Sequence, residues 1–218
     1  MECGYRSIQL SIEVLLWSLL WQCLIGTAIA WLLVRKQFWG KGFLDGIVTM
    51  PLIFPPIVIG YVLLMALGRN GWITTLLPDW IKPQVVFSTQ GLILAAFVAG
   101  LPLMVKPVQT AFANVPMRLH EAASTLGHTK WSIFWRVDLP LIRKGLAAGL
   151  ILSGGRALGE VGISLMLGGN ISGRTETLSL AIYNQVMDGQ FSCANELSLL
   201  LAAFAGLSFY VLRRFGSL

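Results

Sequence analysis

Apolar residues occur along the chain in runs long enough to cross a membrane. Short polar segments separate these runs, which cover about residues 12–34, 43–67, 89–108, 145–167 and 194–212. A bilayer core needs about 20 apolar residues per helical crossing, and a helix satisfies its own backbone groups in lipid. The pattern therefore predicts an all-α polytopic membrane protein with about five transmembrane helices, and we expect residues 1–218 to form a single transmembrane domain.

The composition supports a membrane protein and argues against a nucleic-acid-binding one. Of the residues, 56% are hydrophobic and 12% are charged, whereas roughly 25% are charged in a typical soluble domain. The net charge of +6 comes from Lys and Arg scattered through short loops, not massed on one face as in a nucleic-acid interface. The cysteines Cys3, Cys23 and Cys193 are odd in number and lack metal-ligand spacing, so we expect neither a disulfide framework nor a zinc site.

The first apolar run resembles a cleaved signal peptide at its start. Arg6 precedes it, and Ala28-Ile29-Ala30 imitates a cleavage site. The run continues to Val34, however, and then meets the basic pair Arg35-Lys36. This length and this stop-transfer pair favour a retained helix.

The distribution of basic residues predicts the orientation, because Lys and Arg in short loops accumulate on the cytoplasmic side. The side that carries few basic residues holds Arg6, Arg69, Lys82 and Arg174. The opposite side holds many more: Arg35, Lys36, Lys41, Lys106, Arg118, Lys130, Arg136, Arg143, Lys144, Arg213 and Arg214. We therefore expect a periplasmic N-terminus and a cytoplasmic C-terminus. On the external side, residues 177–187 could form a short surface helix or an ordinary loop helix.

Prolines lie inside two of the predicted spans. The second span contains Pro51, Pro55 and Pro56, and the third contains Pro102 and Pro107. A proline inside a helix removes a backbone hydrogen bond and clashes with the preceding turn, so we expect kinks or interruptions. Broken helices commonly mark transport pathways. Packing alone explains a single proline equally well, whereas the cluster in the second span favours a pathway.

The fourth span contains two G-x-x-x-G pairs, Gly145 with Gly149 and Gly155 with Gly159. Small residues at this spacing let helix backbones approach closely in lipid. The span is therefore predicted to pack tightly against another helix.

The same span carries Arg156 and Glu160, four residues apart. Each charge costs about 2.5–3.5 kcal/mol near the bilayer centre on insertion scales, so the two should pair and face the protein interior. One interpretation is that the pair lies near a pathway or locks one conformation, with Arg156 supplying positive potential for an anionic substrate. The other is a structural ion pair that fixes helix register.

A polar cytoplasmic segment separates the third and fourth spans. It predicts a helix from Met117 to Leu126, a left-handed turn at Gly127, and a second helical piece from about Lys130 to Pro140, near which the fourth span begins. The segment could be a solvated amphipathic connector. Its apolar face favours a helix that docks onto a partner, and this face comprises Ala122, Ala123, Leu126, Trp131, Ile133, Phe134 and Trp135.

These residues carry a family resemblance. Glu121-Ala122-Ala123, then Gly127 after three residues, then Val137-Asp138-Leu139-Pro140 after nine, resembles the EAA loop of permease subunits from binding-protein-dependent ABC importers. Val137 stands where isoleucine is usual. Within that group, segments 51–61, 68–71, 156–162, 169–171 and 175–178 resemble the molybdate permease, with Val161 as a departure from its usual G-E-F-G.

The resemblance implies import of molybdate across the bacterial inner membrane. It implies a homodimer of this subunit in the lipid bilayer, two cytoplasmic ATPase subunits and an external oxyanion-binding protein. The permease would need no cofactor and would not itself be an enzyme, because no phosphate-binding G-x-x-x-x-G-K-[ST] loop is present in the sequence. The residues expected to dock the ATPase are Glu121, Ala122, Ala123, Leu126, Gly127, Leu139 and Pro140.

Two alternatives stay open. The same machinery could carry tungstate, sulfate or thiosulfate, since these anions are similar in size and charge. A more distant alternative is an intramembrane enzyme, which would need a base near its nucleophile. The only histidines, His120 and His128, lie in the cytoplasmic segment and not near Ser153 or Ser164, which argues against the enzyme.

Overall fold

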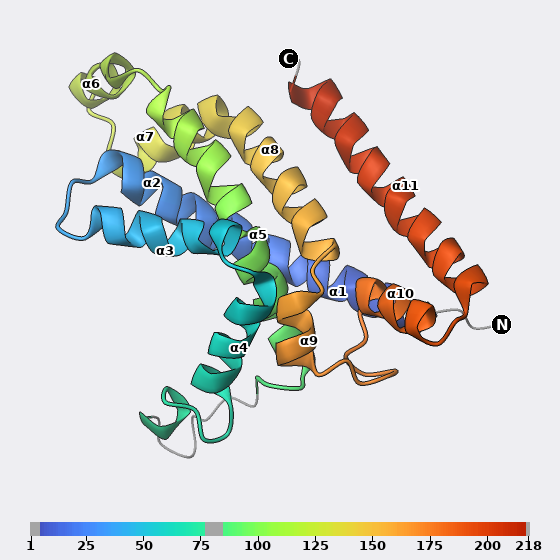
Figure 1. Cartoon of the computed structure of the whole chain (residues 1–218). Helices are drawn as coiled ribbons and strands as arrows, with labels where there is room; N and C mark the ends of the chain where they lie inside the picture. The colour runs from blue at the N-terminus through green and yellow to red at the C-terminus, as the bar shows by residue number, and fades with distance from the viewer. Residues whose placement is uncertain (1–4, 77–84, 217–218) are drawn as a thin grey trace.

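A computed structural model of the chain describes residues 5–76 and 85–216 and shows helices throughout those residues, with no strand among them. The helices pack around one central helix, α5 (Thr89–Ala113) (Figure 1). Lys82, one of the basic residues predicted on the external side, lies outside the described residues. The predicted all-α fold class is confirmed for the described chain.

The first span is one long helical segment with a widened turn in its middle. It consists of α1 (Tyr5–Trp21), the π-helical turn η1 (Gln22–Gly26) and α2 (Thr27–Arg35). The residues that imitate a signal-peptide cleavage site lie inside α2, so the helix continues through them. Gly26 lets η1 approach α5, because a Cβ at Gly26 would lie 2.8 Å from Met104 Cγ.

The second span is interrupted, as its prolines predict. It is divided into α3 (Lys41–Ile53) and α4 (Pro56–Leu67), with Phe54 and Pro55 in extended conformation between them. Proline disfavours the helical region for the residue before it, which explains a break before Pro55 and Pro56. Pro51, in contrast, lies within α3 without interrupting it.

The central helix α5 runs as one helix through Pro102 and Pro107. The sequence predicts a kink or an interruption at these prolines, and the structure has no interruption there. The Ser88 hydroxyl accepts a hydrogen bond from Gly91 N (3.3 Å) and caps the start of α5. Much of α5 is packed against neighbouring helices, and its buried side chains include Leu92, Ala96, Met104, Val108 and Phe112.

The fourth span is bent. Three helical elements follow one another here without a gap: α7 (Lys130–Ile133), the π-helical turn η3 (Phe134–Asp138) and α8 (Leu139–Leu158). A break follows α8, and α9 (Gly162–Gly168) continues at an angle of 62°. The π-helical turn passes into α8 at Leu139, so Pro140 lies in the first turn of α8, near the predicted start of the fourth span.

The two broken spans meet at their outer halves. A Cβ at Gly60 in α4 would lie 2.9 Å from Ile163 Cα, and one at Gly162 would lie 3.0 Å from Ile57 N. Figure 1 shows α4 and α9 together at one end of the molecule, with α6 (Met117–Thr125) at the other end. The interruptions therefore allow two short helices to pack backbone against backbone.

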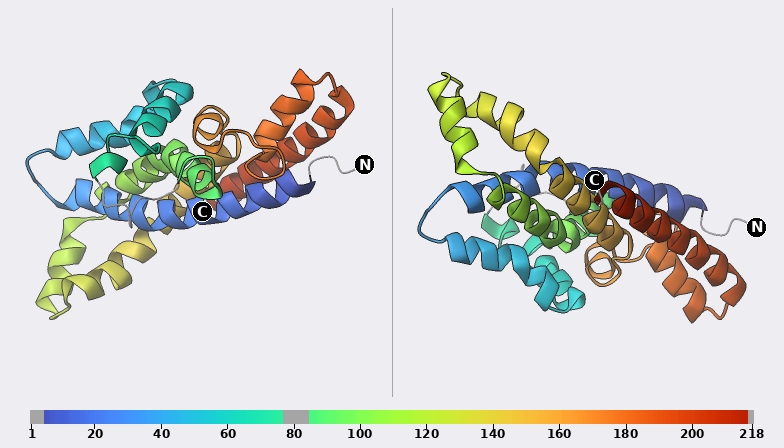
Figure 2. Two further views of the ribbon diagram at one scale, coloured as in Figure 1. Left: turned by 90° about the horizontal axis from the view of Figure 1, so that it is seen from below. Right: turned by 90° about the horizontal axis from the view of Figure 1, so that it is seen from above.

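The last part of the chain forms α10 (Leu178–Met187) and the long α11 (Phe191–Gly216). The C-terminal end of α11 lies at the same end of the molecule as α6, and α10 lies beside the start of α1 (Figures 1 and 2). Cys193, near the start of α11, is disulfide-bonded, whereas Cys23 is free. Our expectation that the cysteines form no disulfide is therefore wrong, and Cys3 lies outside the described residues.

Helices occupy all five predicted spans. By length and composition, Arg6–Arg35 and Thr89–Ala113 could each cross a membrane, and so could Lys130–Leu158 with Gly162–Gly168 if this bent pair is one span. The second and fifth spans contribute the shorter apolar helices Pro56–Leu67 and Phe191–Leu207.

Candidate functional site

Helix α6 ends as its sequence predicts. It is followed by Gly127, whose φ of +80° lies in the left-handed region. The turn is closed by two backbone hydrogen bonds, from Gly127 N to Ser124 O (3.0 Å) and from His128 N to Ala123 O (3.1 Å). Glycine suits this position because a Cβ disfavours the left-handed conformation.

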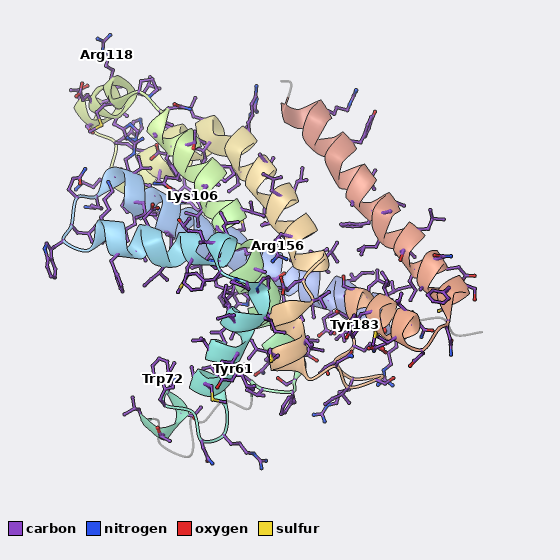
Figure 3. The ribbon with its side chains drawn as sticks, viewed as in Figure 1. Tyr61, Trp72, Lys106, Arg118, Arg156 and Tyr183 are labelled. Atoms are coloured by element: carbon purple, nitrogen blue, oxygen red, sulfur yellow. The ribbon has the colours of Figure 1, made fainter. Side chains whose placement is uncertain are left out.

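The outer surface of α6 carries part of the predicted docking set. Glu121, Ala122 and Gly127 are exposed, and Leu126 is 78% exposed. Ala123, at 7% exposure, faces the rest of the protein. Figure 3 shows Arg118 at the far tip of α6, pointing away from the other helices. The helix thus presents a small-residue, mixed-charge surface to its surroundings.

The aromatic residues of the loop form one cluster beside α6. Trp131 stacks on Phe134 with ring centroids 5.9 Å apart, and Trp135 meets both rings edge-on at 5.8 and 5.7 Å. The expected apolar face has two parts: Trp131 and Trp135 are exposed, and Ile133 packs inside the protein.

Leu139 and Pro140 do not belong to the α6 surface. Both lie at the start of α8, where Leu139 packs partly buried against the main core cluster. Pro140 is exposed. Within the described chain, the Leu-Pro pair begins a long helix, while the Glu-Ala-Ala segment provides the exposed surface.

Arg156 and Glu160 form an ion pair, with Arg156 Nη1 2.6 Å from Glu160 Oε2. The Glu160 side chain is 1% exposed and that of Arg156 is 29% exposed. Glu160 lies after the end of α8, in the break before α9, and its Oε1 accepts a hydrogen bond from Ile163 N (2.7 Å). One carboxylate therefore joins the two halves of the bent span. Figure 3 shows Arg156 at the centre of the molecule.

The glycine pairs of the fourth span differ in their surroundings. A Cβ at Gly145 would lie 2.5 Å from Ala111 Cβ, and one at Gly149 would lie 3.0 Å from Met104 O, so this pair lets α8 lie against α5. A Cβ at Gly155 would meet nothing within 4 Å, and one at Gly159 would meet only Gly155 O. Tight packing against another helix, expected for both pairs, is therefore absent at the second pair within the described chain.

The sequence reasoning missed a charged contact between α2, α6 and η3. Asp138, 2% exposed, lies in η3. Its Oδ1 accepts a hydrogen bond from Arg35 Nη2 (3.1 Å) and lies 2.9 Å from His120 Nε2. The sequence shows all three residues, but Arg35 lies 103 positions from Asp138, so their contact across the fold could not be read from it.

Polar residues elsewhere were missed as well. Gln22, fully buried in η1, donates through its side-chain nitrogen to Ala96 O (2.9 Å) and so ties the first span to α5. At the opposite end, Asn184 donates to Glu176 Oε1 (2.6 Å) and exchanges hydrogen bonds with Asn170. These contacts give a physical role to Asn170 and Glu176, which lie in segments that resemble the molybdate permease.

Comparison with known proteins agrees with this geometry. The family "binding-protein-dependent transport system inner membrane component" matches residues 22–215. The molybdenum transport system permease protein ModB of Haemophilus influenzae is 40% identical over 91% of this chain and 86% of that protein. Its Escherichia coli K12 counterpart is 38% identical over 95% and 91% of the two chains. The sulfate permease CysW of Synechocystis is also similar, with 33% identity over 91% of this chain and 72% of that protein.

Solved structures share the fold. A bacterial ABC transporter that imports alginate matches with a TM-score of 0.70, 17% identity and coverage of 98% of this chain and 80% of that chain. The methionine ABC transporter MetNI, in an inward-facing conformation, also matches with a TM-score of 0.70, at 20% identity, over 97% and 94% of the chains. The resemblance noted in the sequence is thus confirmed. The chain belongs to the family of binding-protein-dependent transport system inner membrane components, as an ABC transporter permease subunit with the type I importer fold and not itself an enzyme.

Proposed function

We propose that this permease imports molybdate as one half of a homodimer in the bacterial inner membrane. The observation that carries the proposal is the similarity to molybdenum permeases, at 38–40% identity over more than nine-tenths of this chain, together with an exposed α6 that matches the EAA pattern. In this scheme an external oxyanion-binding protein delivers the anion. Two ATPase subunits supply the energy, and the dimer forms the pathway.

The ATPase docks on α6 in this proposal. Exposed Glu121 makes the charged contact, exposed Ala122 lets a partner surface come close, and Leu126 contributes an apolar anchor. The exposed rings of Trp131 and Trp135 extend the same surface. Apolar side chains of this size are otherwise unfavourable in water, which supports a partner at this place.

Arg156 faces the pathway in this proposal. Its side chain keeps 29% of its surface exposed although its partner Glu160 is almost wholly buried. A cation that keeps part of its surface accessible, at the centre of the molecule, can supply positive potential to an oxyanion that approaches it. Uptake by Arg156→Gln and Arg156→Lys tests this role: we expect activity in the Lys variant and loss in the Gln variant, and wild-type uptake in the Gln variant would contradict it.

The proposed orientation places α6 and the C-terminal end of α11 in the cytoplasm and the start of α1 in the periplasm. The excess of basic residues near α6 supports it. So does the disulfide at Cys193, since disulfides persist in the oxidising periplasm and are rare in the cytoplasm. Both observations support a periplasmic α10–α11 turn.

A second candidate cargo is sulfate, because a sulfate permease is 33% identical over 91% of this chain. Tungstate and thiosulfate belong to the same group of anions. The deciding experiment is uptake of radioactive molybdate into proteoliposomes that contain the permease, its ATPase subunit and its binding protein, with unlabelled competitors. We expect competition by molybdate and tungstate but not by excess sulfate. Complete competition by sulfate at equal concentration would overturn the molybdate assignment.

A further inference from the structure

The coupling loop is linked to the first span by a buried carboxylate. Asp138 Oδ1 accepts a hydrogen bond from Arg35, the last residue of α2, and lies within ion-pair distance of His120 in α6. The exposed fractions of the three side chains are 4% for Asp138 and 16% for each partner. We call this group of Asp138, Arg35 and His120 the carboxylate joint.

The three residues come from segments that the chain itself does not connect directly. Arg35 is separated from Asp138 by 103 positions, and His120 lies one residue before the exposed Glu121 of α6. Arg35 also reaches the start of α6, with Nη1 4.0 Å from Met117 Sδ. His120 therefore lies next to the docking surface that the proposed function assigns to α6, and Arg35 contacts the start of the same helix.

The chain itself joins the loop to two spans, to α5 through residues 114–116 and to α8 through the continuous helix that begins at α7. Because Lys130–Leu158 is unbroken, a movement of the loop passes directly into α8. The first span has no such connection to α6. Since Arg35 and Asp138 are both largely buried, their contact is shielded from salt and held in one geometry.

The local backbone explains why Asp138 can reach both partners. It is the last residue of the π-helical turn η3. A π-turn holds an additional residue within a helix and frequently occurs at functional sites. Asp138 thereby points into the loop while Leu139, the next residue, packs against the core.

We propose that Asp138 is a positioning residue for coupling, which transmits the movement of α6 to the first span through Arg35. The proposal rests on the proposed function, since it concerns how ATP-driven movement reaches the membrane. Asp138 need not touch the anion or the ATPase. Without the carboxylate, α6 would still seat on the ATPase and move α8, but the first span would no longer follow.

The test is the amount of radioactive molybdate taken up per ATP hydrolysed in the reconstituted transporter. We expect the ratio to fall about fivefold or more in Asp138→Asn and in Arg35→Gln, the lower end of a typical coupling between two sites. The double variant should be no worse than either single one, because both remove the same contact. Arg35→Lys, which keeps the charge, should recover part of the ratio.

The matched control is Asp45→Asn, which removes a different ion pair, with Lys106 Nζ 2.7 Å from Asp45 Oδ1 between α5 and α3. We expect it to keep the wild-type ratio. A merely structural role for Asp138 would lower the amount of assembled transporter and leave the ratio unchanged. The ratio is therefore measured on purified complexes of equal subunit composition.

A second readout follows the geometry itself. Spin labels at Ser124→Cys in α6 and Gln37→Cys after α2 should keep one narrow distance distribution with and without ATP, and Asp138→Asn should broaden it. Wild-type ratios in both single variants, or an equal loss in Asp45→Asn, would overturn the inference. A wild-type transporter that takes up no molybdate with ATP would overturn the proposed function and the inference together.

Discussion

Single atoms decide how closely the helices of this permease approach one another. At Gly145, an added Cβ would lie 2.5 Å from Ala111 Cβ, closer than van der Waals contact allows. At Gly155, ten residues along the same helix, the same atom would meet nothing. Gly155 can therefore accept an added methyl group and Gly145 cannot, although both glycines occur in the same kind of sequence motif.

We expect Gly145→Ala to destabilise the protein by about 1–3 kcal/mol, the usual cost of overpacking. Gly155→Ala should be neutral or slightly stabilising, because alanine is favoured over glycine within a helix by about 1 kcal/mol. Thermal unfolding of the purified protein in detergent measures both. Equal melting temperatures for the two variants would contradict the close contact between α5 and α8.

Glu160 has two partners, and its substitutions should separate them. Glu160→Ala removes the ion pair with Arg156 and the hydrogen bond from Ile163 N, and we expect a loss of about 3–5 kcal/mol, typical of a broken buried pair. Glu160→Gln keeps an acceptor for Ile163 N, so its loss should be smaller by about 1 kcal/mol. Unfolding by SDS in mixed micelles measures the difference, and equal losses would show that the hydrogen bond contributes nothing.

The residues at which helices end determine how whole helices are placed against one another. Either proline should be enough to keep the break between α3 and α4, since each one disfavours the helical region for the residue before it. We expect Pro55→Ala alone to keep the break, because Pro56 remains. The double variant with Pro56→Ala should extend α3, pull α4 away from α9 and reduce uptake.

Pro51→Ala is the control for this pair, since Pro51 lies inside α3 without interrupting it. It should leave uptake unchanged and stabilise α3 by restoring a backbone donor. Amide hydrogen exchange at Ile57 reports on the break itself, because Pro55 and Pro56 carry no amide hydrogen: faster exchange of Ile57 in the wild type than in the double variant supports it. Unchanged exchange in the double variant would show that packing alone keeps α4 in place.

The turn after α6 gives a prediction for coupling. Gly127→Leu forces a branched side chain into the left-handed region, at a cost of about 1–2 kcal/mol, and should misplace α6 so that ATP hydrolysis continues with little uptake. Gly127→Asn should retain coupling, because asparagine tolerates this conformation. Glu121→Lys should weaken coupling less than Gly127→Leu. ATP hydrolysis and uptake measured together decide it, and full coupling in the Leu variant would exclude docking through α6.

The sequence predicts a structural feature well when that feature depends on residues close together in the chain, and poorly when it depends on residues far apart. Local rules were sufficient for the turn at Gly127 and for the break at Pro55, because each depends on neighbours in the chain. They failed at Pro102 and Pro107, where packing of α5 against other helices outweighs the local preference. They also failed for Asp138, whose main partner Arg35 is 103 positions away. Contacts of that range become visible only when the helices are placed together.

At the scale of the whole molecule, the described chain has two functional ends. Figure 1 shows α6 at one end and the paired helices α4 and α9 at the other, with the central α5 between them. The positions of the basic residues agree with a cytoplasmic α6 end. The proposed orientation rests on charge, whereas the arrangement of the helices follows from packing.

The orientation can be tested with single cysteines in exposed connections. In a Cys23→Ser background, Gln190→Cys, between α10 and α11, should react with a membrane-impermeant maleimide in intact cells. Gln37→Cys, between α2 and α3, should react only after the cells are opened. The background protein without an added cysteine gives the blank. The reverse pattern would place α6 outside the cell and exclude its role with an ATPase.

The close contact between α4 and α9 restricts how this protein can vary. The atom that blocks a side chain at Gly60 is the backbone Cα of Ile163, with Met166 Cβ equally near, and the atom that blocks one at Gly162 is a backbone nitrogen. A smaller side chain elsewhere can relieve a crowded side chain, but no substitution removes a backbone atom. In a saturation mutagenesis screen under selection for molybdate uptake, positions 60 and 162 should therefore accept only glycine, and no second-site suppressor within α4 or α9 should restore a variant at either position.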